Sequence, residues 1–199
     1  MNTPLETEVL QLHARNYPGG VFAEHVFTKM KVKDILRFEG PLGSFFLRDT
    51  PEDVPIIFLA SGTGFAPIKS ILEHVFYQEA GNSEKSGKNS KRKMTLYWGV
   101  RTKADLYLAD LAKQWQQQHH NFTFIPVLSD ALPEDNWKGR EGFVHEAVLQ
   151  DFHALENHQV YACGSPVMVK AAYQDFTTQR NLPKDGFFSD VFTPSTSNQ

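Results

Sequence analysis

The stretch that decides the fold is "VPIIFLASGTGFAPIKSIL", residues 54–72. It opens with a short apolar run that contains β-branched residues, as in a buried strand. Further along, apolar residues recur three and four positions apart, which places them on one face of a helix: Ile68, Ile71, Leu72, Val75 and Phe76. A strand that leads directly into a helix predicts an α/β unit.

The turn between this strand and helix carries Gly62, Thr63, Gly64 and Pro67. Glycine tolerates the angles of a sharp turn and lets a ligand approach the main chain closely. The free N–H groups and the positive end of the helix dipole attract phosphate. Pro67 stands where the usual dinucleotide-binding sequence has its third glycine. The turn by itself therefore fits a phosphate loop and a plain strand–helix connection equally well.

Three more strand-like runs alternate with helical segments, namely "MTLYWG", "FTFIPVL" and "QVYACG". This alternation predicts a doubly wound parallel sheet with helices on both faces. Residues 6–38 differ, because Val9 alternates with Gln11 while Leu10 and Leu12 fall on the opposite face. A two-residue period predicts half-buried β-strands in this region.

A second strand–helix junction, "VYACGSP", repeats the logic of the first. Cys163 and Gly164 end a strand, Ser165 is a suitable N-cap, and Pro166 suits the first helical position. Both junctions should lie at the carboxyl edge of one parallel sheet, where open α/β folds bind ligands. Cys163 taken alone fits a small buried hydrophobe better than a functional thiol.

A third strand ends at "YWGVR", with Gly99 and Arg101 and no acidic residue beside the glycine. Arg101 suits a ribose or a 2′-phosphate, and it equally suits an ordinary surface position. Residues 80–93 are polar, and we expect them to form a mobile loop. The basic cluster Lys91–Lys93 fits a solvated loop better than a phosphate site.

Composition excludes several classes of protein. The net charge of −3 over 199 residues gives no reason to expect nucleic acid or an anionic membrane as a partner. A single cysteine excludes an intrachain disulfide and a multi-cysteine zinc or iron–sulfur site, and it fits a cytoplasmic location. The eight histidines are scattered, so we expect no metal site. The chain has no G-x-S-x-G sequence of a serine hydrolase and no apolar stretch of membrane-spanning length.

Taken in order, the segments resemble the ferredoxin–NADP reductase superfamily across almost the full chain. They are "YPGGVFAEHV", "EGPLGSFFLR", "LASGTGFAPIKSIL", "LYWGVR", "GREGFVHEAV", "YACGSPVMV" and "FFSDVF". Within it the chain looks most like bacterial NAD(P)H:flavin reductases of the CDP-6-deoxyhexose glucoseen, phenol monooxygenase and methane monooxygenase type. The resemblance implies transfer of a hydride from NAD(P)H to FAD, and of electrons to a ferredoxin-type domain or another acceptor protein.

The resemblance also implies roles for individual residues. Cys163 and Asp190 would shape the hydride path without acting as nucleophiles. The nicotinamide nucleotide would be bound by Gly62, Thr63, Gly64, Pro67, Gly99, Arg101, Gly164 and Pro166. FAD would be bound by His13, Arg15, Gly19, Gly20 and Phe192. Ser129 and Asp130 stand where relatives that prefer NADPH carry a serine followed by an arginine, so NADH is favoured, with Arg101 as the counter-argument.

Departures from the family limit this reading. The Arg-x-Tyr-Ser flavin signature, the preceding barrel strands and a four-cysteine ferredoxin segment are missing, and Ala23 replaces a serine or threonine. We therefore expect the C-terminal portion of a longer reductase. Residues 1–50 would form a partial antiparallel FAD-type β-barrel, and residues 51–199 a NAD(P)-binding α/β domain. FAD binding should be weak, so the alternatives are a nucleotide-binding remnant without turnover and an interaction module with an empty pocket.

Overall fold

The core of the protein is a six-stranded parallel sheet in the order β4-β3-β2-β1-β5-β6. The computed structural model describes residues 8–40, 42–51, 53–86 and 92–192. The strands are β1 Ile56–Ser61, β2 Met94–Val100, β3 Phe122–Leu128, β4 Arg140–Glu141, β5 Gln159–Gly164 and β6 Phe187–Val191. The predicted α/β class with a doubly wound parallel sheet is confirmed.

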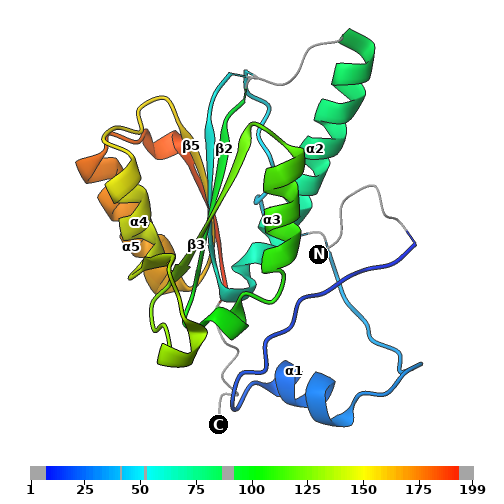
Figure 1. Cartoon of the computed structure of the whole chain (residues 1–199). Helices are drawn as coiled ribbons and strands as arrows, with labels where there is room; N and C mark the ends of the chain where they lie inside the picture. The colour runs from blue at the N-terminus through cyan, green and yellow to red at the C-terminus, as the bar shows by residue number, and fades with distance from the viewer. Residues whose placement is uncertain (1–7, 41, 52, 87–91, 193–199) are drawn as a thin grey trace.

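Helices cover both faces of the sheet (Figure 1). Helices α2 (Phe65–Ser86) and α3 (Ala109–Gln118) pack on one face, and α4 (Val144–Asp151) and α5 (Pro166–Gln179) pack on the other. Strand β1 alternates between the two cores, since Phe58 and Ala60 face α2 while Ile57 and Leu59 face α5. This double burial explains why the sequence of β1 is continuously apolar. Within the described residues, no helix is long and apolar enough to cross a membrane.

The order in which strands are added to the sheet reverses at β1, which lies between β2 and β5. From β1 the strands proceed outward to β4, and the chain then returns to place β5 on the other side of β1. Ala60 and Cys163 are register partners near the carboxyl ends of these two strands. The two glycine-containing junctions therefore lie side by side at the topological switch point, where open α/β folds bind ligands.

The strands expected within residues 6–38 are not formed in the described part of that region. It contains only the short helix α1 (Val21–Glu24) and a π-helical turn (His25–Lys29), and the rest is extended or turns. A strand needs a hydrogen-bonded neighbour, and no other described segment pairs with this one. Both faces of the predicted alternation stay exposed, with Val9 at 59% and Leu12 at 55%. The turn predicted at "YPGG" is present, since the Gly20 amide donates to the Tyr17 carbonyl at 3.0 Å.

The polar segment 80–93 also differs from expectation. Helix α2 continues to Ser86, and Arg92 is buried. The Arg92 guanidinium donates to the carbonyl oxygens of Thr50 and Pro51, at 2.9 and 3.0 Å. Arg92 thus joins the residues just before β2 to the residues just before β1. Lys91 and the other residues of 87–91 lie outside the described residues.

The segment that precedes β1 is attached to the sheet through Arg48. The Arg48 amide donates to the Tyr161 hydroxyl on β5 at 2.8 Å, and the Arg48 guanidinium lies 4.0 Å from the centre of the Phe46 ring and 5.0 Å from that of Phe188 on β6. Phe45 packs edge-on to Tyr161. These contacts fix where the N-terminal region leaves the sheet.

Replacement of Gly64 by alanine should destabilise the fold. An added Cβ would lie 2.1 Å from the Cys163 carbonyl oxygen, a backbone atom that cannot rotate away. We expect the free energy of unfolding to fall by about 1–3 kcal/mol in urea titrations. The control is Gly81→Ala on α2, where nothing lies within 4 Å of the added Cβ. It should stabilise the helix by about 0.5–1 kcal/mol, and equal stability of the two variants would contradict the steric argument.

Candidate functional site

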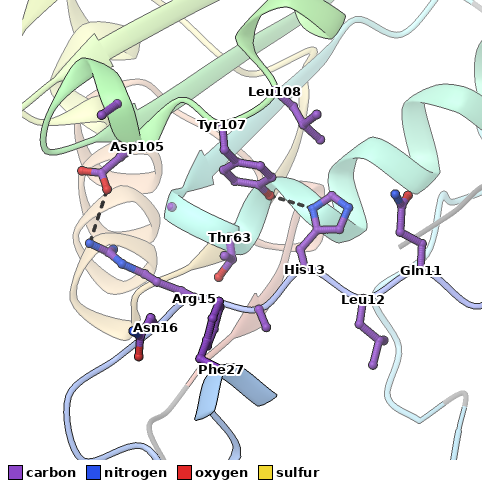
Figure 2. A pocket seen from close by; sticks show the side chains of 13 residues that line it. Gln11, Leu12, His13, Arg15, Asn16, Phe27, Thr63, Asp105, Tyr107 and Leu108 are labelled. Atoms are coloured by element: carbon purple, nitrogen blue, oxygen red, sulfur yellow. Dashed lines mark hydrogen bonds and ion pairs between the residues drawn. The ribbon is translucent and has the colours of Figure 1, made fainter. Parts of the chain in front are cut away.

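A cavity of about 570 Å³ lies between the N-terminal segment 11–16 and the turn after β1 (Figure 2). It is lined by Gln11, Leu12, His13, Ala14, Arg15, Asn16, Phe27, Gly62, Thr63, Ala104, Asp105, Tyr107 and Leu108. The volume falls within the range of small-molecule and cofactor sites. Its wall therefore combines residues of the N-terminal region with residues of the sheet domain.

The sheet-domain wall of the cavity contains the short 3₁₀ helix η2, Gly62–Gly64. Gly62 has a φ of 52°, a left-handed conformation that glycine adopts without strain. The Trp98 indole N–H donates to the Gly62 carbonyl at 2.9 Å, which fixes the orientation of the turn. The Arg15 Nη1 atom lies 3.5 Å from the place that a Cβ on Gly62 would occupy. A cation therefore lies over a backbone turn, the combination that suits a phosphate group.

The sheet domain also contributes residues in and next to a second 3₁₀ helix, η3 (Lys103–Asp105), which follows β2. The Asp105 carboxylate accepts from the Thr102 amide and hydroxyl, at 3.1 and 3.2 Å. The same carboxylate lies 3.7 Å from the Arg15 guanidinium. Two residues later, the Tyr107 hydroxyl lies 2.7 Å from Nδ1 of His13 (Figure 2). These two contacts join segment 11–16 to the sheet domain.

The His13 imidazole and the Tyr107 phenol are both uncharged at neutral pH, and desolvation shifts both pKa values further in that direction. Desolvation lowers the pKa of His13 to about 4, and nearby Lys69 contributes in the same direction. It raises the pKa of Tyr107 above its ordinary value. The cavity therefore presents a neutral imidazole and a protonated phenol, and Arg15 is its cation.

The two strand–helix junctions contact each other directly. Gly164 has a φ of 134°, and a Cβ there would lie 2.2 Å from the Ser61 hydroxyl oxygen. The same hydroxyl accepts from the Ser165 amide at 2.8 Å. Pro166 occupies the first helical turn after the N-cap Ser165, as predicted.

The Cys163 thiol is fully buried beside this junction. Burial raises the pKa of Cys163, and the charge of Asp190 adds to the effect, so the thiol stays protonated at neutral pH. Asp190 is the register partner of Cys163 on β6 and is exposed. The Phe192 amide donates to the Gly164 carbonyl at 2.9 Å, so the end of β6 returns to the junction.

A third group of candidate residues lies at the ends of β2 and β3. Arg101 and Asp130 are exposed and form an ion pair with a distance of 2.9 Å between Nη2 and Oδ2. Ser129 donates its amide to the Val100 carbonyl at 2.9 Å. Gly99 packs against α4, because an added Cβ would lie 2.6 Å from that of Val144. The sequence suggests opposite coenzyme preferences for Arg101 and Asp130, whereas in the structure the two side chains pair with each other.

The cavity brings together four of the candidate site residues, namely His13, Arg15, Gly62 and Thr63. The others lie outside its lining: Gly64, Pro67, Gly99, Arg101, Ser129, Asp130, Cys163, Gly164, Pro166, Asp190, Phe192, Gly19 and Gly20. Gly64, Pro67, Cys163 and Gly164 are buried. Gly20 is the N-cap of α1, and Gly19, with a φ of 76°, lies in the turn before it.

Tyr107, Asp105 and Phe27 in the lining, and Trp98 behind it, were not predicted from the sequence. No spacing rule could indicate them, because they reach the cavity from separate loops and strands. Among the described residues, no group of three or more His, Cys, Asp or Glu side chains could hold a metal ion.

A doubly wound parallel sheet with glycine-containing turns at its switch point defines a dinucleotide-binding α/β protein. The chain matches the family described as "Oxidoreductase NAD-binding domain" over residues 58–174 and that described as "Oxidoreductase FAD-binding domain" over residues 1–47. It belongs to the ferredoxin reductase-like family of FAD- and NAD-binding oxidoreductases.

Known proteins support this assignment. The chain is 44% identical to Protein RfbI of Salmonella typhimurium, over 96% of this chain and 53% of that protein. It is 40% identical to the CDP-6-deoxy-L-threo-D-glycero-4-hexulose-3-dehydrase reductase of Yersinia pestis, over 98% of this chain and 54% of that one. The Amycolatopsis cytochrome P450 reductase GcoB superposes with a TM-score of 0.83 at 32% identity, over 97% of this chain and 55% of that one. The chain thus spans about half the length of these relatives.

The His13 imidazole should titrate with a midpoint near pH 4 in the folded protein, because its pKa is lowered to about 4. Unfolded chains bind the proton near pH 6.5, so between these values the unfolded state holds more protons and the free energy of unfolding decreases as the pH falls. The measurement is a proton NMR titration of the histidine C2–H signals, with His13→Gln to assign the resonance. In that variant this part of the pH dependence should be absent. A His13 midpoint near 6.5 would contradict the structure.

Proposed function

We propose that this chain binds NAD(P)H and a flavin and transfers a hydride between them, as the cofactor-binding portion of a reductase that passes electrons to an acceptor protein. The observation that carries the proposal is the position of Arg15 over the Gly62 turn. A residue of the FAD-binding match and a turn of the NAD-binding match thus face one cavity.

The residues present fit the phosphate groups of such cofactors. Gly62 offers a turn with no side chain in the way, Thr63 offers a hydroxyl, and Arg15 offers a positive charge. Apolar side chains from Leu12 and Phe27 complete the wall, as a flat aromatic ring requires. The cofactors supply the redox chemistry, and the protein binds and orients them.

The buried thiol of Cys163 and the carboxylate of Asp190 are proposed to shape the path of the hydride. A protonated, fully buried thiol is a poor nucleophile, which agrees with a packing role. Both residues lie where β5 and β6 end, one junction away from the Gly62 turn. Asp190 is exposed and free to face a ligand bound at this edge.

The electron acceptor is proposed to be a protein, either a ferredoxin-type iron–sulfur domain or a separate component. The relatives named above include a hexulose dehydrase reductase and a cytochrome P450 reductase, whose names imply protein-mediated electron delivery. The chain covers about half of each of them. We therefore propose that the acceptor is bound by the complete reductase.

A second candidate function is nucleotide binding without turnover. It is favoured by the N-terminal region, where the described residues form no strand and leave large apolar side chains exposed, with Val32 at 93% and Ile35 at 91%. A flavin held by this region would have a loosely packed wall. The nucleotide side is well packed in comparison, since Phe65 and Trp98 are both fully buried.

Reduction of a flavin by NADH is the direct test. With purified chain, FAD and NADH under anaerobic conditions, the flavin absorbance at about 450 nm should decrease at a rate that depends on protein concentration. Arg15→Gln removes the cation and should slow this reaction about tenfold or more, because a charge-assisted phosphate contact is lost. The matched control is Arg37→Gln, an exposed arginine outside the cavity.

The outcomes separate the candidate functions. A thermal shift with NADH but no flavin reduction would support the nucleotide-binding remnant. No thermal shift with either NADH or NADPH would overturn both the reductase and the nucleotide-binding proposals. An interaction module would then be the remaining candidate function. Equal rates of flavin reduction by Arg15→Gln and Arg37→Gln would show that Arg15 does not bind the cofactor.

NADH is proposed as the preferred coenzyme, because Asp130 would repel a 2′-phosphate and also pairs with Arg101, the nearest candidate to bind one. The variant Asp130→Arg should raise kcat/KM for NADPH relative to NADH by about tenfold, a change of about 1.4 kcal/mol. The measurement is steady-state kinetics with both coenzymes. Asp110→Asn removes an exposed carboxylate that pairs with Lys113 on α3 and should leave the ratio unchanged. An unchanged ratio in Asp130→Arg would refute the assignment.

A further inference from the structure

Tyr107 contacts both walls of the cavity. Its hydroxyl lies 2.7 Å from Nδ1 of His13, which belongs to the N-terminal wall. Its ring stands edge-on to the indole of Trp98, with the ring centres 5.2 Å apart and an angle of 90° between the planes. Figure 2 shows the phenol beside His13, with the Thr63 side chain below it.

The nucleotide-side contact is rigid. Trp98 and Phe65 are fully buried and stack on each other with 4.0 Å between ring centres. The Trp98 indole N–H is committed to the Gly62 carbonyl at 2.9 Å. A continuous series of contacts therefore connects His13, through Tyr107 and Trp98, to the backbone of Gly62.

The N-terminal wall has fewer contacts of this quality. The ion pair between Arg15 and Asp105 is 3.7 Å long, and the Arg15 side chain is 51% exposed. Such pairs contribute little to stability. The bond between Tyr107 and His13 is 2.7 Å long and involves a half-buried imidazole, so it is a stronger link than the Arg15 ion pair.

A phenol O–H and a neutral imidazole can form this bond in two directions, depending on which ring nitrogen of His13 carries the proton. Burial raises the pKa of Tyr107, so the phenol keeps its proton at neutral pH. Burial lowers the pKa of His13, so the ring is neutral and carries one proton. When the phenol O–H donates to Nδ1, the proton of the imidazole resides on Nε2.

Resting on the function proposed above, we infer that Tyr107 is a positioning residue: it donates to Nδ1 of His13, fixes the tautomer with the proton on Nε2, and holds segment 11–16 at a set distance from the Gly62 turn. The flavin side and the nicotinamide side of the cavity then keep one spacing. Without the hydroxyl, both walls persist but their separation is no longer set.

The first test uses the ligand-free chain. In the wild type, the ring-nitrogen NMR shifts of His13 should report the Nε2–H tautomer. The variant Tyr107→Phe should give a mixture of tautomers and lower backbone order parameters in residues 11–16, while those of β1 and β2 stay unchanged. The control is Tyr77→Phe, which removes the hydroxyl of an exposed tyrosine on α2 outside the cavity.

The second test measures affinity. Tyr107→Phe should raise the Kd for FAD about three- to tenfold, the effect of one hydrogen bond, and leave the Kd for NADH unchanged. His13→Ala should raise the Kd for FAD by a similar factor. The double variant of Tyr107→Phe and His13→Ala should show no further rise, because both substitutions remove the same interaction. Tyr77→Phe should bind both cofactors like the wild type.

Several results would overturn the inference. They are an Nδ1–H tautomer in the wild type, unchanged NMR parameters in Tyr107→Phe, or an equal loss of FAD and NADH affinity, which indicates a general structural defect. If the wild type binds no FAD while the NMR changes occur as expected, the flavin part of the proposed function fails and the positioning role of Tyr107 stands.

Discussion

The structure depends on how closely two backbone turns approach each other at the centre of the sheet. Gly64 lies against the Cys163 carbonyl, and Gly164 lies against Ser61, at distances that exclude any side chain. This contact joins the carboxyl ends of β1 and β5 at the switch point. It leaves Gly62 and Thr63 directed toward the cavity. Glycine at these positions is thus required first for packing, and the ligand-facing turn is a consequence of that packing.

The two walls of the cavity differ in how firmly they are held. The nucleotide side rests on buried aromatic rings and on the Trp98–Gly62 hydrogen bond. The contacts of the N-terminal side include the polar contacts of His13 and Arg15 with Tyr107 and Asp105. Local stability follows the density of buried apolar contacts, so the N-terminal wall belongs to the less stable part of the molecule. The distance between the two cofactors would therefore be set largely by the less stable wall.

A reaction that depends on geometry suits such an architecture. The cavity contains a neutral imidazole, a protonated phenol and a guanidinium that pairs with the Asp105 carboxylate, and the thiol nearby is buried and protonated. These groups can bind and orient a ligand, and none of them is tuned to act as a base or nucleophile at neutral pH. Hydride transfer between bound cofactors asks the protein for position, exclusion of water and a fixed distance.

The sequence by itself determined the sheet, its helices and the two glycine turns. Apolar periodicity and turn residues are local signals, and each of them acts within a few positions of the chain. Those signals predicted strands within residues 6–38 wrongly, because a strand also needs a partner that local pattern does not supply.

Only the tertiary structure decided which side chains share the cavity. Tyr107 and His13 are 94 positions apart, and their contact arises because η3 and segment 11–16 converge on one turn. The pairing of Arg101 with Asp130 was likewise invisible in the sequence, since it depends on β2 and β3 lying side by side. Contacts between distant segments follow from the packing of whole elements, and no short stretch of sequence contains that information.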